Sequence, residues 1–394
     1  MECSPKLVFG IFYGDNMIKI LCIFMALLWP YAAGAAPITV TDIAGRTVTL
    51  PAAAQKVVLG EGRFMAIFGV LGVPDPVSRV AGMMNEFRLY DASGYAQYQK
   101  AFPGIDQIPN FGHTSEQSVS IEKILLLNPD VAIFGLDGHG PGAESAHIIQ
   151  RLEAANIPVV FIDFRVDPIA NTAKSVELVA KVLGADAAGA TFRQWYDAEL
   201  AEISRRVASI PKADHPTVLF DLRVESSQEC CFTVGKGLFA SMAEFVGARS
   251  LATDVMATPV GKLSKEFVLS AEFDFYVGTA TGGAQDLAAK SPVFERIVTG
   301  ATITPMQARQ SLQDVIAARG FNQLKLIQAG RAYGLWHHFY NSPLNLYAIQ
   351  VMAKWFHPKP FADLQPDQTL QKMLGGFKPV TLEGTYAIRV GSDQ

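Results

Sequence analysis

Motifs for catalysis and for metal binding are missing from this 394-residue sequence, and their absence excludes several classes of protein. There is no GxSxG nucleophile turn, no HExxH zinc motif, no P-loop and no spaced set of cysteines and histidines. Basic residues are not in excess either, since 33 Lys and Arg stand against 37 Asp and Glu, which gives a net charge of −4. A nucleic-acid partner is therefore not expected, because such partners need a basic surface.

Cysteine is scarce, and half of it lies in the first 35 residues. Those two residues are Cys3 and Cys22, while the other two, Cys230 and Cys231, are adjacent. In an oxidising compartment an adjacent pair can form a vicinal disulfide. The sequence leaves this interpretation open beside that of two free, partly buried thiols.

The first 35 residues have the pattern of a secretory signal peptide. Lys19 precedes the apolar run 20–29, and Ala33-Gly34-Ala35 has the small residues that a signal peptidase needs. We expect cleavage after Ala35 and export to the periplasm, with Met17 as an alternative start to Met1. The apolar run is too short for a membrane span, and no later run is long enough.

The remaining sequence alternates strand and helix patterns, which predicts an α/β fold with largely parallel sheets. A hairpin is expected over 38–50, and residues 185–210 form one long helical pattern that Pro211 ends. The expected strands are short apolar runs, at 56–60, 79–83, 131–135, 158–163, 217–223, 274–280 and 331–336. The expected organisation is a signal peptide, an N-terminal lobe, a linking helix and a C-terminal lobe, over residues 1–35, 36–184, 185–210 and 211–394.

A weak internal repeat indicates that the two lobes are built alike. At an offset of 144 residues, SIEKILLLNPDVAIFG (120–135) aligns with SKEFVLSAEFDFYVGT (264–279). Each segment reads as a helix with a serine cap, a turn and a strand. Each also has a glutamate in the first turn of the helix, Glu122 or Glu266, where the helix dipole favours a carboxylate.

The ordered set of motifs resembles the periplasmic binding proteins of importers for iron complexes and vitamin B12, known as class III. The segments that carry the resemblance follow one another in the family's order and cover nearly all of the chain after residue 35: ITVTDIAGRTVTLP, KVVLG, SIEKILLLNPDVAIFG, NIPVVFIDF, the long helix, EFVGARSLATD and LSKEFVLSAEFDFYVG. The resemblance implies two Rossmann-like lobes joined by a rigid helix, with a ligand cleft between them. It also implies that Glu122 and Glu266 dock onto arginines of a membrane permease dimer.

Candidate ligand contacts come from the loops that follow the strands, because ligands of such sheets lie at the carboxyl ends of the strands. Arginine binds anionic oxygens through paired hydrogen bonds. The GLWHHFYNSPLN segment (334–345) offers imidazole and phenol groups, and an extended chain here would place His337 and His338 on opposite sides. The selected ligand-binding residues are Arg63, Arg88, Arg165, Arg223, His338 and Tyr340. Direct metal ligation by His338 and Tyr340, ligand contact without ligation, and a structural loop remain three interpretations.

The sequence and the resemblance favour transport over catalysis. We expect the substrate-binding component of an ABC importer, which captures a ferric siderophore in the periplasm and delivers it to an inner-membrane permease with its ATPase. Haem and cobalamin are the alternative ligands, and a periplasmic metal or thiol enzyme is the alternative class. We expect a monomer without an intrinsic cofactor.

Overall fold

The computed structural model describes residues 36–224, 230–282, 296–374, 380 and 382–391. The expected signal peptide, residues 1–35, lies outside them. The predicted hairpin is present, because β1 (Ile38–Thr41) pairs with β2 (Thr47–Leu50) in antiparallel register around the turn at Gly45. Gly45 has a φ of +79°, a conformation that glycine adopts without the steric cost of a side chain.

The first lobe is built on a five-stranded parallel sheet with the order β5-β4-β3-β6-β7. Its strands are β3 (Val57–Leu59), β4 (Val80–Met84), β5 (Asn110–Gly112), β6 (Val131–Gly135) and β7 (Val159–Ile162). Four of these match the predicted runs. No apolar run predicts β5, which has only three residues.

The second lobe is built on another five-stranded sheet, with the order β10-β8-β12-β14-β16. Its strands are β8 (Thr217–Asp221), β10 (Arg249–Ser250), β12 (Phe275–Ala280), β14 (Ala332–Trp336) and β16 (Ala387–Arg389). All pairings are parallel except that of β16, the edge strand, which runs antiparallel to β14. Two short pairs lie beside this sheet, β9 (Phe232–Val234) with β11 (Val260–Lys262) and β13 (Gly300–Ala301) with β15 (Gly384–Thr385).

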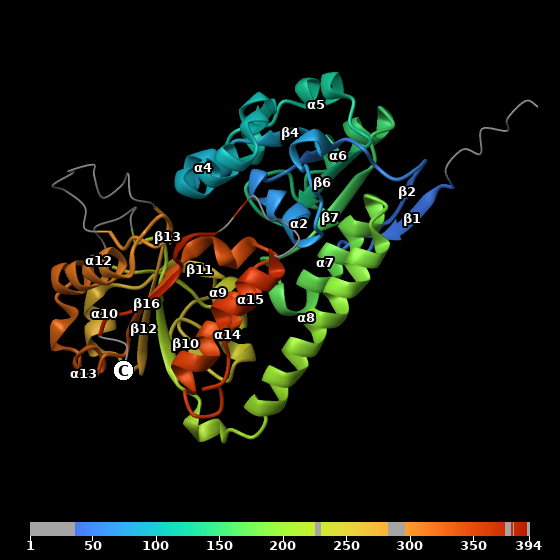
Figure 1. Ribbon diagram of the computed structural model, residues 1–394. Coiled ribbons are helices and arrows are strands. Elements are labelled where there is room, and N and C mark those ends of the chain that lie inside the picture. Colours follow the sequence, from blue (N-terminus) through green and yellow to red (C-terminus); the bar gives the residue numbers. More distant parts are fainter. Residues whose placement is uncertain (1–35, 225–229, 283–295, 375–379, 381, 392–394) are drawn as a thin grey trace, which may run out of the picture. The chain divides into compact units, whose positions relative to one another are not determined.

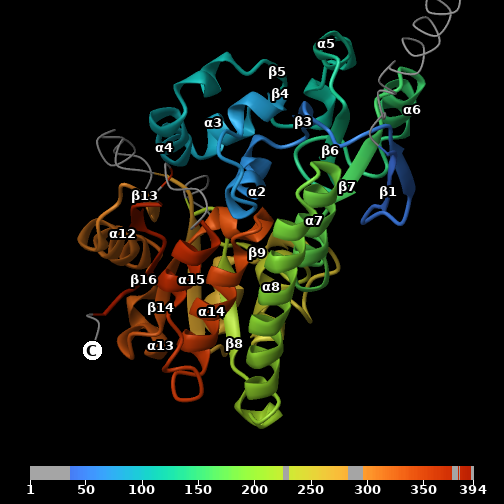
Figure 2. The same cartoon turned by 45° about the vertical axis from the view of Figure 1, so that its right-hand side comes forward.

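Helices surround both sheets (Figures 1 and 2). The helices of the first lobe, together with the linking helix α8 that follows it, are α2 (Met65–Val70), α3 (Glu86–Tyr90), α4 (Ala92–Ala101), α5 (Ile121–Leu127), α6 (Ala146–Ala154), α7 (Pro168–Val182) and α8 (Asp186–Val207). In the second lobe they are α9 (Leu238–Phe245), α10 (Lys265–Ser270), α12 (Pro305–Ala318), α13 (Lys325–Gln328), α14 (Asn345–Phe356) and α15 (Pro366–Met373). The chain is thus an α/β protein with two lobes.

Helix α8 is the long helix that the sequence indicated, and it runs alongside the second lobe in both views (Figures 1 and 2). Its 22 residues span about 33 Å. A buried polar chain fixes it, because Tyr196 donates to Asn345 Oδ1 over 2.8 Å and Asn345 Nδ2 donates to Thr172 Oγ1 over 2.7 Å. These bonds tie α7, α8 and α14 together, which gives the link between the lobes its stiffness.

The internal repeat is structural. Ser120 caps α5 by accepting from Lys123 N, and Ser264 caps α10 by accepting from Phe267 N. In each lobe an aspartate then ends the turn and binds the start of the neighbouring strand, since Asp130 accepts from Lys56 N over 2.8 Å and Asp274 accepts from Thr217 N over 2.9 Å. The same hydrogen bonds therefore join the helix, the turn and the strand in both lobes.

The segment after β14 differs from the sequence prediction. Residues His337–Asn341 form a 3-10 turn, and α14 begins at Asn345. Ser342 Oγ accepts from Leu344 N, so it holds the turn and does not cap the helix. Because the chain is not extended here, the expected alternation of His337 and His338 does not apply. Among the described residues, no helix is both long and apolar enough to cross a bilayer.

Candidate functional site between the lobes

Loops from the carboxyl ends of both sheets meet at one place. From the first lobe come the 3-10 turn Gly62–Phe64 after β3 and residue His139 after β6. From the second lobe comes the His337–Asn341 turn after β14. Because parallel strands end at the same edge of a sheet, this is where a two-lobed α/β protein places its ligand.

A buried ion cluster lies at the centre of this region. Arg63 is 7% exposed, and its Nη2 lies 2.7 Å from Glu61 Oε2. Glu86, which is fully buried, accepts from Arg63 N over 3.1 Å, and its Oε1 lies 3.6 Å from Arg63 Nε. Two carboxylates therefore surround one guanidinium. Their attraction offsets much of the desolvation cost of burying the three charged groups.

The cluster also connects the two lobes. Arg63 Nη1 donates to His338 Nδ1, and His338 Nε2 donates to the carbonyl of Tyr90 over 3.2 Å. Asn341 Nδ2 donates to Glu61 Oε2 over 2.9 Å. Glu61 also accepts from His139 N over 3.1 Å, and a side chain at Gly138 would collide with that carboxylate. The lobes thus contact each other through the segments that follow β3 and β4 in the first lobe and β14 in the second.

Burial and charge shift the pKa values in this cluster in different directions. Burial raises the pKa of Glu86 to about 7, against the opposing effect of Arg63. Burial also acts to raise the pKa of Glu61, but Arg63 and His139 outweigh it, so the pKa of Glu61 is lowered. For His338, burial and then Arg63 hold the pKa well below its usual value, which makes the imidazole neutral at pH 7. The neutral ring fits its hydrogen bonds, one accepted and one donated.

Three of the four selected arginines come together around two tyrosines. The guanidinium of Arg165 lies 5.6 Å from the ring centre of Tyr340, and that of Arg63 lies 5.7 Å from the same ring. Arg223 lies 5.2 Å from the ring of Tyr90. Arg165 and Arg223 are half-buried, so they combine a fixed stacking geometry with access to solvent.

Arg88 does not join this group. It is exposed on α3, and its guanidinium lies 5.8 Å from the ring centre of Tyr95. His337, which was not selected, is buried with the others: its Nδ1 lies 2.8 Å from Thr279 Oγ1, and its ring lies 4.7 Å from that of Tyr340. The i, i+3 spacing of the 3-10 turn explains this, because it brings His337 and Tyr340 to one side.

The sequence analysis did not select Glu61, Tyr90, His139 and Asn341, although all but Tyr90 lie in loops that it considered. Glu61 directly follows the predicted strand 56–60, and His139 lies four residues after the predicted strand 131–135. Their position at the carboxyl ends of strands could have marked both as candidates. Tyr90 gave no comparable signal, because its contacts are made with His338 and Arg223 of the opposite lobe. In the described residues no group of three or more His, Cys, Asp or Glu side chains is placed to hold a metal ion. Both nitrogens of His338 are engaged, and this weighs against direct ligation by that residue.

The remaining sequence-selected residues lie away from the ion cluster. The sulfur atoms of Cys230 and Cys231 are bonded to each other, Cys231 is fully buried, and Arg319 Nη1 lies 3.8 Å from Cys231 Sγ. Glu122 and Glu266 are exposed near the starts of α5 and α10, at equivalent positions of the two lobes. Glu122 pairs with Arg151 at 3.1 Å.

Comparisons with known proteins agree with this architecture. Residues 57–230 match the family model described as periplasmic binding protein. Among curated proteins, no sequence matches the chain. A solved structure titled TroA-like periplasmic binding protein FepB, from Veillonella parvula, is 24% identical with a TM-score of 0.78, over 90% of this chain and 100% of that one.

Two further solved structures share the fold at lower identity. The molybdate-binding protein MolA of a Haemophilus influenzae ABC transporter is 16% identical with a TM-score of 0.63, over 88% of this chain and 99% of that one. The heme-binding protein RhuT from Roseiflexus sp. RS-1 is 18% identical with a TM-score of 0.53, over 78% of this chain and 99% of that one.

The family model matches residues 57–230, less than half of the chain, and together with the two-lobed fold it supports the resemblance to the class III periplasmic binding proteins. The matched family is described as periplasmic binding protein, and the similar MolA is the binding protein of an ABC transporter.

Proposed function

We propose that this protein captures an anionic ferric siderophore between its lobes and delivers it to the permease. The observation that carries the proposal is the crossed stacking of two arginines. Arg165, from the first lobe, lies over Tyr340 of the second, while Arg223, from the second lobe, lies over Tyr90 of the first. Half-buried guanidiniums from both lobes can hold carboxylate or catecholate oxygens by paired hydrogen bonds.

The charge balance of the site supports an anionic ligand. Arg63 is neutralised by Glu61 and Glu86, so its charge is used inside the protein. Arg165 lies 3.7 Å from Asp137, an exposed carboxylate that water screens. Arg165 therefore brings positive charge to the region between the lobes of a chain whose net charge is −4. The lack of a metal-holding side-chain group in the described residues fits an iron ion that brings its own chelator.

The test is a fluorescence titration of the purified mature protein with ferric catecholate, hydroxamate and carboxylate siderophores, haem and cobalamin. We expect saturable binding of one ferric class, weakened by about 1–3 kcal/mol in Arg165→Ala and in Arg223→Ala, because a hydrogen bond to a charged group is lost. Arg88→Ala is the matched control, since this residue lies outside the cluster. Equal affinity of all variants would remove the arginines from the site.

Haem is the second candidate. Tyr340 OH lies 3.4 Å from His139 Nε2, which pairs a phenol with an imidazole in the same region. Either group can ligate haem iron. A haem complex would give a Soret band that Tyr340→Phe shifts, whereas a siderophore protein would show no saturable haem spectrum.

Delivery to the permease would use Glu122 and Glu266. Each carboxylate is exposed on the short capped helix that the repeat places in both lobes, and each helix also exposes a leucine, Leu126 at 85% and Leu269 at 43%. A carboxylate on each lobe can meet a basic pocket on each permease subunit and fix the orientation of the complex.

A further inference from the structure

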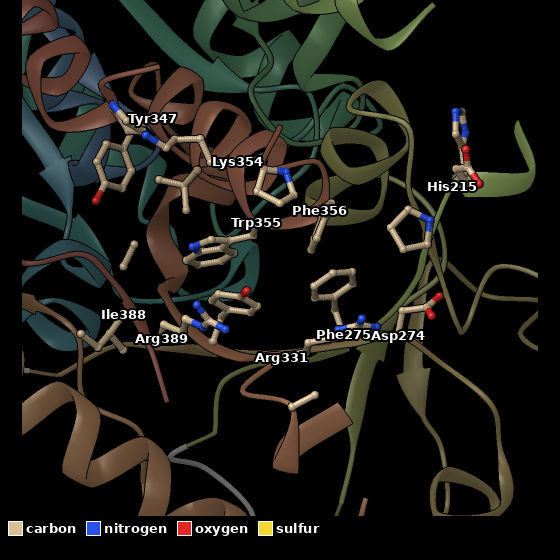
Figure 3. A pocket seen from close by; sticks show the side chains of 18 of the residues that line it. His215, Asp274, Phe275, Arg331, Tyr347, Lys354, Trp355, Phe356, Ile388 and Arg389 are labelled. Carbon is tan, nitrogen blue, oxygen red and sulfur yellow. The ribbon is translucent and has the colours of Figure 1, made fainter. Parts of the chain in front are cut away.

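A second groove lies at the opposite end of the second lobe from the ion cluster. It is lined by the starts of β8, β12 and β14, the edge strand β16 and the helix α14, and its volume is about 950 Å³. Figure 3 shows Trp355, Phe275, Arg331 and Arg389 around one open space. Small-molecule sites fall in the range of about 300–1,000 Å³, so this groove is large enough for a ligand of several rings.

The apolar part of the groove is a set of aromatic rings. Trp355 stacks on Tyr333, with ring centres 4.3 Å apart and an angle of 22° between the planes. Phe275 lies 6.1 Å from Tyr333 and 5.1 Å from Phe356. Tyr333 is 5% exposed, whereas Trp355 is only half-buried and borders the open space. A flat ligand could therefore add to an existing stack at low cost.

The polar part of the groove is a pair of guanidiniums. Arg331 is exposed and lies 5.6 Å from the ring centre of Phe275. Arg389 is held in place by its Nε, which donates to the carbonyl of Gly330 over 2.9 Å. Both lie near the phenol of Tyr333: burial raises the pKa of this phenol, and Arg389 and Arg331 oppose the rise. Two guanidiniums beside an aromatic stack form a site for a planar anion.

The other charged groups of the groove are already engaged. Asp274 accepts from Thr217 N over 2.9 Å, and Asp367 is hydrogen-bonded to Tyr347. Lys354 donates to the carbonyls of Ala362 and Leu364 over 3.2 and 2.6 Å. Asp214 lies on the turn before β8, at a different part of the lining from β16. Arg331 and Arg389 are the cationic groups that lie beside the rings of Phe275 and Tyr333.

We propose that this groove is a second small-molecule site, which takes a planar aromatic carboxylate with its ring against Trp355 and its carboxylate at Arg331 and Arg389. The site lies at the amino ends of the strands of the second sheet, whereas the Arg223 and Tyr340 region lies at their carboxyl ends. It does not depend on which ligand the lobes hold between them.

The experiment follows the indole N–H resonances of the mature protein by NMR, with the Trp355 signal assigned from Trp355→Phe. Naphthoate is expected to shift the Trp355 signal saturably and to leave the signals of Trp195 and Trp336 in place. Naphthylmethylamine, which has the same rings and the opposite charge, and cyclohexanecarboxylate, which has the charge without an aromatic face, should each bind at least about tenfold more weakly.

Variants separate this groove from the other site. Arg331→Ala should weaken naphthoate binding at least about tenfold, whereas Arg205→Ala, the loss of an exposed arginine on α8, should leave it unchanged. Arg223→Ala should also leave it unchanged. The proposal is overturned if naphthoate gives no saturable shift at Trp355, if the amine binds as well as the carboxylate, or if Arg223→Ala removes the binding. The comparison of probes on the unaltered protein stands even if a variant fails to fold.

Discussion

Arg63 shows at the scale of a single residue how burial changes a predicted role. The sequence selected it as a ligand contact because it follows a strand, but its guanidinium is enclosed by Glu61, Glu86 and His338. A guanidinium with such partners stabilises the folded protein, and both of its Nη atoms are already bonded within the protein. Arg165 and Arg223, which are half-buried and stacked on tyrosines, are the better candidates for ligand contact.

Removing the side chain of Arg63 should therefore destabilise the fold. We expect Arg63→Ala to lower the free energy of unfolding by about 3–5 kcal/mol, because two buried carboxylates lose their counter-charge. Urea denaturation followed by circular dichroism measures this. The exposed Arg88→Ala should change the free energy by less than about 0.5 kcal/mol. A stability of Arg63→Ala equal to that of the unaltered protein would mean that the ion cluster is not formed in solution.

Glu86 should make stability depend on pH. Its pKa is raised to about 7 by burial, whereas in the unfolded chain it returns to its ordinary value near 4.5. Between these values the folded state binds more protons than the unfolded state, so its contribution to stability is present below about pH 4.5 and is lost as the pH rises through 7.

The matching experiment compares Glu86→Gln with the unaltered protein. Glutamine keeps the acceptor for Arg63 N but does not titrate. The unfolding free energy should therefore fall less steeply with pH between pH 5 and pH 7.5, and the difference in slope should correspond to at most about one bound proton. Asp91 and Asp221, whose pKa values are raised to about 6 by burial, and His337 and His338, whose pKa values burial holds well below the usual value, remain in both proteins and together set the residual slope. Identical slopes would show that Glu86 is ionised in the folded state throughout this range.

At the scale of the elements, the repeated unit of capped helix, turn and strand is the most informative feature. Ser120 and Ser264 cap their helices, and Asp130 and Asp274 close the same hydrogen bonds in both lobes. These bonds depend only on residues close in sequence or on the adjacent strand, which is why the repeat could be found without a structure. The 3-10 turn at His337–Asn341 could not, because its conformation is fixed by partners in the other lobe.

The helices α5 and α10 carry the docking prediction. Glu122→Ala combined with Glu266→Ala should leave ligand affinity unchanged and abolish uptake in cells, because both carboxylates are exposed and lie outside the ion cluster. Uptake of the radiolabelled ligand by a strain that carries only the double variant measures this. Glu153→Ala, the loss of an exposed glutamate on α6, is a control that should transport normally. Normal uptake by the double variant would remove the docking assignment.

At the scale of the whole molecule, the link between the lobes predicts little movement on binding. Helix α8 is tied to α7 and α14 by Tyr196 and Asn345, and Arg206 binds Asp363 beyond α14. The lobes already contact each other through Glu61 and Asn341. A hinge needs residues that can change their backbone angles freely, and a helix fixed along its length does not offer them.

We therefore expect the radius of gyration to change by less than about 1 Å when ligand binds. Small-angle X-ray scattering of the free and the saturated protein measures this. A double variant, Tyr196→Phe with Asn345→Ala, removes the buried bonds to α8 and should allow a larger change. A decrease of several ångströms in the unaltered protein would contradict a stiff link.

The sequence by itself determined the α/β class, the hairpin, seven strands of the two large sheets, the long helix and the repeat. Each of these rests on local patterns, namely short apolar runs, caps and helical spacing, which act over a few residues. The tertiary structure alone decided which loop residues meet. It enclosed Arg63, left Arg88 outside on α3, and brought His139, Tyr90 and Asn341 to the cluster. The physical reason is that burial and charge pairing join residues up to 280 positions apart, and no local pattern records such a distance.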